Sequence, residues 1–143
     1  MIQIDYLVLA DAVAAVGGKH YIHGGGWDTI AAASFPIVHN AMALAARLRV
    51  PWSATNQPCA LELDVIDADG RSILPNPPGP LRGTINVGRP PELPAGEDQV
   101  LPLAFPLHGL RFERAGTYDI VLRLSNGAEA RAPFRVVQAQ AAQ

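Results

Sequence analysis

The sequence predicts an all-β fold, an antiparallel β-sandwich of about eight strands. Short segments in which apolar and polar residues alternate recur along the chain, and such alternation is typical of half-buried strands. Gly, Pro, Asn and Asp separate these segments at regular intervals, as expected for turns. No segment shows a convincing helical period. Runs of strands without intervening helices favour two packed sheets.

The clearest element is a C-terminal hairpin. Alternating runs at 118–124 and 130–136 flank Asn126 and Gly127, the strongest short-range signal for a two-residue hairpin turn. Tyr118 follows a glycine at the start of the penultimate strand, where Greek-key sandwiches place a tyrosine corner. The hairpin and this tyrosine together predict Greek-key, immunoglobulin-like character.

The N-terminal part predicts a second hairpin. Residues 2–10 form a strand with apolar side chains on both faces, and the alanine-rich stretch 11–16 ends at a Gly-Gly turn. Residues 19–23 return as its partner. Gly24, Gly25 and Gly26 follow, then a further segment over 27–32. Three glycines in a row lose much conformational entropy when the chain folds, so their presence needs a structural reason. We expect them to form a bend or a bulge between strands.

The segment 40–50 admits two interpretations. Its alanine, leucine and arginine residues are good helix formers, and Asn40 is a suitable N-cap. However, apolar residues occupy every second position and Pro51 ends the run, so we predict a strand. Residues 59–66 alternate again, and 67–70 form a turn into a short strand at 71–74.

The region 75–94 is rich in proline, and only residues 81–87 within it resemble a strand. The following strand, 100–107, carries Pro102 and Pro106 at matching positions. Alternate backbone N–H groups of a strand point to the same side, so both missing donors lie along one edge. This pattern predicts an edge strand.

Composition limits the class of protein. The chain has 143 residues, enough for one domain over 1–137 with a flexible tail at 138–143. A net charge of −2 with dispersed basic residues gives no basis for binding nucleic acid or an anionic membrane. Cys59 is the single cysteine, which excludes an intramolecular disulfide. Asp5 and Asp11 interrupt the apolar N-terminus, so we expect no signal peptide and a cytoplasmic protein.

The sequence contains no arrangement that defines a catalytic, cofactor or metal site. His20 and His23 lie three residues apart, on opposite faces of a strand, and therefore do not converge on a metal. No serine or cysteine carries a nucleophile signature, and the glycine run lacks the pattern of a phosphate-binding loop. Asp67 and Asp69 resemble half of a calcium loop, but a hairpin turn explains them better.

The remaining candidates for binding are aromatic and loop residues. His23, Trp27, Asp28 and Trp52 form the candidate ligand-binding set, because loops at the ends of a sandwich often carry recognition residues. The structural alternative is that Trp27 drops into the core between the sheets.

Several motifs together resemble a known family. They are Asp5-Tyr6, Leu9-Ala10-Asp11, the Gly-Lys-x-Tyr-Ile run at 18–22, the run at 24–30, Phe35-Pro36 with His39, the runs at 48–52, 67–70 and 87–91, and Pro133 to Val137. The chain thus resembles a bacterial, largely actinobacterial, domain-of-unknown-function family of small stand-alone β proteins. The resemblance covers nearly the whole chain. It implies no reaction, cofactor or site residue.

We therefore expect a non-enzymatic binding or self-assembly module without a cofactor. The expected partner is a second copy, associated through an edge strand or an apolar patch. Two alternatives stay open. The first is a small-molecule or carbohydrate binder, or a weakly active hydrolase, with a cleft near Trp27 and Trp52. The second is a calcium-dependent domain that uses Asp67 and Asp69.

Overall fold

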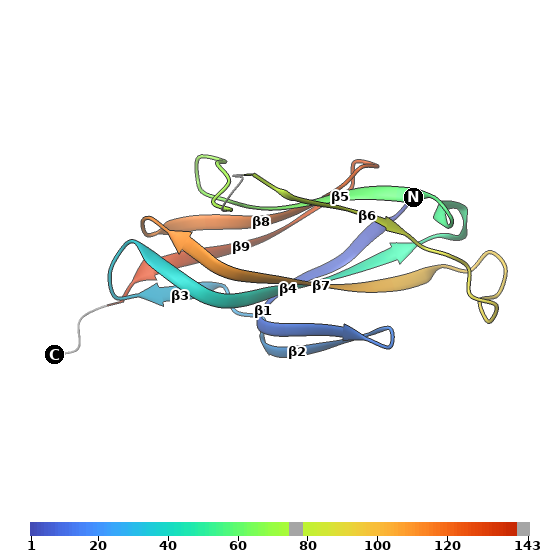
Figure 1. The fold of residues 1–143 in the computed structure, drawn as a ribbon, viewed down its shortest axis with the longest axis horizontal. Helices are drawn as coiled ribbons and strands as arrows, with labels where there is room; N and C mark the ends of the chain where they lie inside the picture. Colours follow the sequence, from blue (N-terminus) through green and yellow to red (C-terminus); the bar gives the residue numbers. More distant parts are fainter. Residues whose placement is uncertain (75–78, 140–143) are drawn as a thin grey trace.

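The computed structural model describes residues 1–74 and 79–139, and this part of the chain contains nine strands and one short 3-10 turn (Figure 1). The turn spans Trp52–Ala54. The strands are β1 (Gln3–Val16), β2 (Lys19–Gly25), β3 (Thr29–Ala32), β4 (Ile37–Val50), β5 (Pro58–Ile66), β6 (Leu81–Asn86), β7 (Gln99–Phe112), β8 (Gly116–Leu124) and β9 (Glu129–Gln138).

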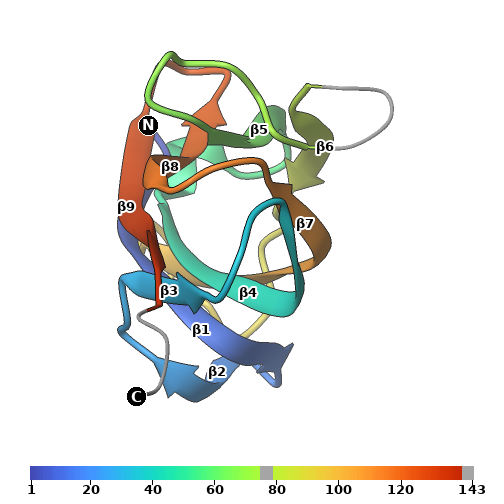
Figure 2. The same ribbon diagram turned by 90° about the vertical axis from the view of Figure 1, so that its left-hand side faces the viewer.

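The strands form two sheets that face each other. Sheet A has the order β2-β1-β4-β7, and sheet B has the order β3-β9-β8-β5-β6. Figure 2 shows β5, β6 and β8 of sheet B at the top and β4, β1 and β2 of sheet A below them, with β2 lowest. The named pairs are antiparallel except β3 and β9, which run parallel. In one sheet, β4 and β7 occupy the places of strands B and E of an immunoglobulin sandwich. In the other sheet, β5, β8 and β9 occupy the places of strands C, F and G. The predicted fold class is confirmed.

The core fills the space between the sheets. Leu44 and Leu48 of β4 and Leu63 of β5 are fully buried, as are Ile120 and Leu122 of β8. The prediction of a strand over 40–50 is therefore correct. Helix propensity is overruled because Met42, Leu44 and Leu48 repeat with a period of two, which puts these large side chains on one face of a strand, toward the core.

Three strands are longer than predicted. β1, β4 and β7 each contain 14 residues. β1 continues through the alanine-rich stretch because it changes partner after Ala10, pairing first with β4 and then with β2. Residues 11–25, hereafter the arm, consequently form the β2 end of sheet A, which lies below the part of the sheet made by β4 and β7 (Figure 1).

β7 is an edge strand of sheet A, as Pro102 and Pro106 predicted. The two prolines lie opposite Arg47 and Ala43 of β4. β9 extends to Gln138, and the backbone N–H of Ala139 donates to the Ala32 carbonyl at 2.7 Å. Most of the expected flexible tail, residues 140–143, and the start of the proline-rich region, residues 75–78, lie outside the described residues.

The predicted tyrosine corner is present. The Tyr118 hydroxyl donates to the Arg114 carbonyl at 2.7 Å across the β7–β8 connection. The ring is buried and packs against Phe112 and Phe134, with centroid distances of 5.0 Å and 5.6 Å. Burial raises the pKa of Tyr118 above its usual value of 10.0, so the hydroxyl stays protonated and able to donate.

Tyr118→Phe tests this corner. The variant keeps the buried ring but leaves the Arg114 carbonyl without its donor. We expect the free energy of unfolding, measured by chemical denaturation, to fall by about 1–2 kcal/mol. Tyr21→Phe is the matched control, because the Tyr21 side chain is 51% exposed and should leave stability unchanged.

Candidate functional site

Trp27 lies between β2 and β3 and is half-buried against the edge of the core. Its ring meets His39 edge-on, with centroids 6.3 Å apart. Beside it is an open hollow of about 290 Å³, whose lining includes Asp11, Thr29 and Ile30. The indole Nε1 is buried and has no hydrogen-bond partner among the described residues, so it does not face this hollow. One part of the Trp27 ring therefore packs against the core, and another part lines the hollow.

The glycines before Trp27 have a steric reason. Gly24 has a φ of +60°, and a Cβ at this position would overlap the Asp11 carboxylate. A Cβ on Gly25 would approach a methyl group of Ile22 to 2.6 Å. Gly26 has a φ of +85°, and its N–H donates to the Leu9 carbonyl at 2.8 Å. The run therefore lets the chain turn closely around the base of the arm.

Gly24→Ala tests this steric role, with Gly18→Ala as the matched control. Both glycines have positive φ, which costs an alanine about 1–2 kcal/mol. Nothing lies within 4 Å of a Cβ on Gly18. Gly24→Ala should lower the free energy of unfolding by about 1 kcal/mol more than the control, because the Asp11 side chain must move. Equal losses in thermal or chemical denaturation would contradict this steric role.

Asp28 does not line the hollow beside Trp27 but lies next to Arg135 of β9. Its carboxylate accepts hydrogen bonds from Thr29 Oγ1 at 2.9 Å and from Arg135 Nη2 at 3.0 Å. These bonds, with that from Thr29 the larger influence, hold the pKa of Asp28 below its usual value. Asp28 belongs to the rim of a hollow on the outer face of sheet B.

Trp52 anchors the proline-rich loop. The Arg89 guanidinium lies 3.9 Å above its ring, a cation–π contact. Arg89 also donates to the Trp52 carbonyl at 3.1 Å and to Thr55 Oγ1 at 2.5 Å. Thr55 is buried and itself donates to the Trp52 carbonyl at 2.7 Å. Trp52 therefore joins the loop after Val87 to the turn after β4.

The structure does not bring the four predicted site residues together. Trp27 stands beside His39 near the start of β4, whereas Trp52 follows the end of this 14-residue strand. A strand of that length spans roughly 45 Å. His23 is exposed on the arm. The described residues form no single cleft that both tryptophans line.

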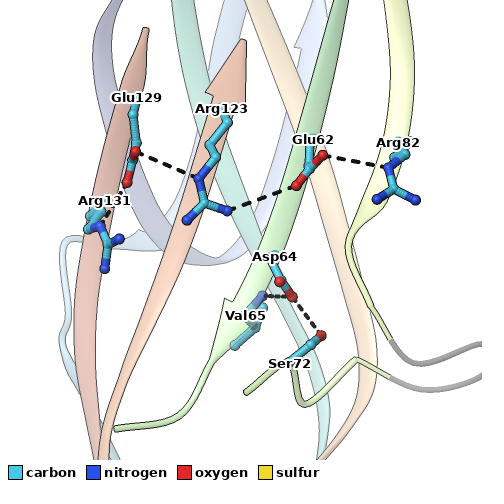
Figure 3. Close-up of polar contacts among 8 residues, drawn as sticks. All are labelled: Glu62, Asp64, Val65, Ser72, Arg82, Arg123, Glu129 and Arg131. Carbon is cyan, nitrogen blue, oxygen red and sulfur yellow. Dashed lines mark hydrogen bonds and ion pairs between the residues drawn. The ribbon is translucent and has the colours of Figure 1, made fainter. Parts of the chain in front are cut away.

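The outer face of sheet B carries a row of alternating charges. Arg82, Glu62, Arg123 and Glu129 lie directly opposite one another on β6, β5, β8 and β9 (Figure 3). Neighbouring members are separated by 3.5, 3.9 and 3.6 Å. Two arginines and two glutamates neutralise each other within the row. Such a face offers no excess charge to a ligand.

Next to this row is an open hollow of about 720 Å³ with three arginines in its lining, Arg123, Arg131 and Arg135. Each of them has a carboxylate partner. Arg131 pairs with Glu129 at 2.9 Å, and Arg135 pairs with Asp28 at 3.0 Å. Because the cations are already paired, the hollow is a poor receptor for a phosphate or another anion.

The turn with Asp67 and Asp69 is stabilised by the protein itself. Asp67 Oδ1 accepts from the backbone N–H groups of Asp69 and Arg71 at 2.9 and 3.0 Å. Asp69 pairs with Arg114 at 3.5 Å. Across residues 1–74 and 79–139, no three His, Cys, Asp or Glu residues converge as metal ligands would. The turn interpretation therefore accounts for this pair.

The arm is the feature that the sequence analysis did not single out. Val16, Tyr21 and Ile22 are 62%, 51% and 39% exposed. Asp11 and Lys19 are the only Asp, Glu, Lys or Arg residues in the arm. A run of fifteen residues with so few charges around a Gly-Gly turn was the available signal.

One histidine ties the arm to sheet A. His20 Nε2 donates to the Leu103 carbonyl of β7 at 2.9 Å, which leaves Nδ1 to accept from the Tyr6 hydroxyl at 2.6 Å. His20 thus lies on the face of the arm that is turned toward the sandwich. Tyr21, its neighbour along the strand, points to the opposite face.

Strand order and the tyrosine corner place the chain among immunoglobulin-like β-sandwiches. A family model matches residues 5–137, and the chain belongs to that family, a family of unknown function designated DUF6941. The resemblance expected from the sequence motifs is confirmed. No curated protein matches the sequence. Within the described residues, no helix has the length and apolar character needed to cross a membrane.

Proposed function

We propose that this chain is a non-enzymatic protein-binding module that uses the arm as its contact surface. The exposed Val16 and Tyr21 carry this proposal. The register of the hairpin puts both on the face that is turned away from His20, and grouped exposed apolar residues are a mark of protein interaction sites.

The stability of the arm supports the same proposal. A two-stranded hairpin is marginally stable in water, and this arm is packed against the rest of sheet A on one face only (Figure 1). Covering one large apolar side chain contributes about 1.5–3 kcal/mol. A bound protein that covered Val16 and Tyr21 would therefore stabilise the arm and gain affinity from the same contacts.

The polar groups elsewhere favour binding over catalysis. The arginines of the hollow on sheet B are paired with carboxylates, and Asp67 caps its own turn. General acid–base or nucleophilic chemistry needs a group that is free to accept or donate a proton at the substrate. These residues are held in structural roles instead.

A small-molecule site beside Trp27 is a second candidate, supported by one observation. The hollow there joins an exposed carboxylate, Asp11, to an aromatic wall and the His39 ring. Its small volume suits a compact ligand with hydroxyl groups, such as a monosaccharide. In a Trp52→Phe background, titration with monosaccharides should change the Trp27 emission. An unchanged spectrum at millimolar concentrations would count against this candidate.

Position-specific cross-linking tests the protein-binding proposal. Tyr21→p-benzoylphenylalanine places a photoreactive group at the centre of the exposed face of the arm. Irradiation in the cells that naturally produce the chain should yield one discrete protein adduct. The same group at Leu81 of β6, which is 50% exposed, is the control and should yield none. Absence of an adduct specific to Tyr21 would refute the proposal.

A further inference from the structure

We infer that the partner of the arm is a second copy of this chain, with the two β2 strands paired antiparallel about a two-fold axis at Tyr21. This inference rests on the proposed function of the arm and names its occupant. It follows from the protection of the other sheet edges, the direction of the free backbone groups on β2, and the distribution of charge along β2.

β2 is the less protected edge of sheet A. The opposite edge of sheet A is β7, where Pro102 and Pro106 lack the N–H groups that a new strand would need. In sheet B, the edge strand β3 has four residues, and β6 has six residues with one charged side chain, Arg82, as β2 has Lys19. Short strands, prolines and charges are the usual means of preventing edge pairing. β2 has seven residues and no proline.

The turn of the arm determines which groups of β2 are free. Gly17 and Gly18 have φ values of +60° and +75°, as in a two-residue hairpin turn that closes on a hydrogen-bonded pair. That pair is Val16 with Lys19. Hydrogen-bonded and non-bonded pairs alternate from there, so His20 and Ile22 direct their N–H and C=O groups to the outer edge. In both ribbon views β2 lies at the margin of the molecule (Figures 1 and 2).

The centre of the pairing follows from the length of the extended segment. Regular extended backbone ends at Gly24, where φ is +60°. The remaining five residues, 19–23, have Tyr21 as their midpoint. A two-fold axis there places Tyr21 opposite the partner's Tyr21 and His20 opposite the partner's Ile22. The free groups of His20 and Ile22 then form the hydrogen bonds that an antiparallel pair requires.

The charges fit a second copy. Lys19 is the only Lys, Arg, Asp or Glu residue in this segment, and the axis places it opposite the partner's His23. The two lysines lie at opposite ends of the paired strands, so no lysine meets its own copy. An aromatic cross-strand pair such as Tyr21 with the partner's Tyr21 contributes roughly 0.2–1 kcal/mol.

The two-fold symmetry also limits the number of chains that can associate. Pairing through β2 uses the same edge of both copies, so it closes at two chains. Sheet A would then continue from one copy into the other, and its two outer edges would both be β7, with prolines that disfavour further strands. The arrangement predicts a dimer and not a fibre.

A disulfide tests the geometry directly. In Tyr21→Cys, the two introduced cysteines form a non-bonded pair with Cα atoms about 4.5 Å apart, within the range that a disulfide spans. Under mild oxidation, the full-length variant should become a covalent dimer. Val16→Cys is the matched control, because Val16 is more exposed, at 62%, but lies roughly 20 Å from its copy in this pairing. The native Cys59 is buried, and the wild-type chain measures its background.

A second pair of variants keeps the inference testable without oxidation. Ile22→Pro removes the N–H that faces the outer edge and leaves the pairing of β2 with β1 intact. Ile22→Ala shortens the side chain but retains that N–H. By size exclusion with light scattering, the wild type and Ile22→Ala should have the mass of two chains and Ile22→Pro the mass of one. Circular dichroism should be alike for all three.

Three outcomes would overturn the inference. They are a wild-type chain that stays monomeric at high concentration, a dimer that Ile22→Pro does not dissociate, and Val16→Cys cross-linking as fast as Tyr21→Cys. If the chain is monomeric while Tyr21 still gives a discrete photo-adduct with another protein, the proposed function stands and the two-fold pairing fails.

Discussion

The burial of both faces of β4 is the constraint on which the rest of the structure depends. Ala43, Leu44, Ala45 and Ala46 of this strand are each exposed by no more than 3%. The leucine side faces sheet B. The alanine side needs cover of its own, and the arm lies below this face of sheet A (Figure 1). Small side chains allow the close approach of a third layer, which a larger side chain at these positions would prevent.

Much of the fold was predictable because its signals are local. The Asn126-Gly127 turn defines the β8–β9 hairpin, and the alternation around Leu44 identifies β4 despite its helix-forming composition. Tyr118 after Gly116-Thr117 indicates the tyrosine corner, and its hydroxyl donates to the Arg114 carbonyl. Each of these elements is indicated by an alternation with a period of two residues or by a short turn motif. Such local patterns can be recognised in one sequence without knowledge of tertiary contacts.

The candidate site was less predictable because its features depend on tertiary partners. Residues 11–16 are mostly alanine and valine, which show no contrast between two faces, so the bend of β1 after Ala10 left no periodic signal. Trp27 and Trp52 are each adjacent to turn residues, and nothing in their spacing reveals that β4 separates them. The edge position of β7 was visible because proline marks it, whereas the unmarked edge β2 was visible only in the sheet order.

The parallel pairing of β3 with β9 affects the order in which the protein can assemble during synthesis. Thr29 to Ala32 have as strand partners Arg135 to Gln138, more than a hundred positions later. The Ile2 carbonyl likewise accepts a hydrogen bond from Asn126 at 2.9 Å. Both contacts can therefore form only after β8 and β9 have been synthesised. Contacts of such long range slow folding, and β3 lacks its strand partner until β9 has been made.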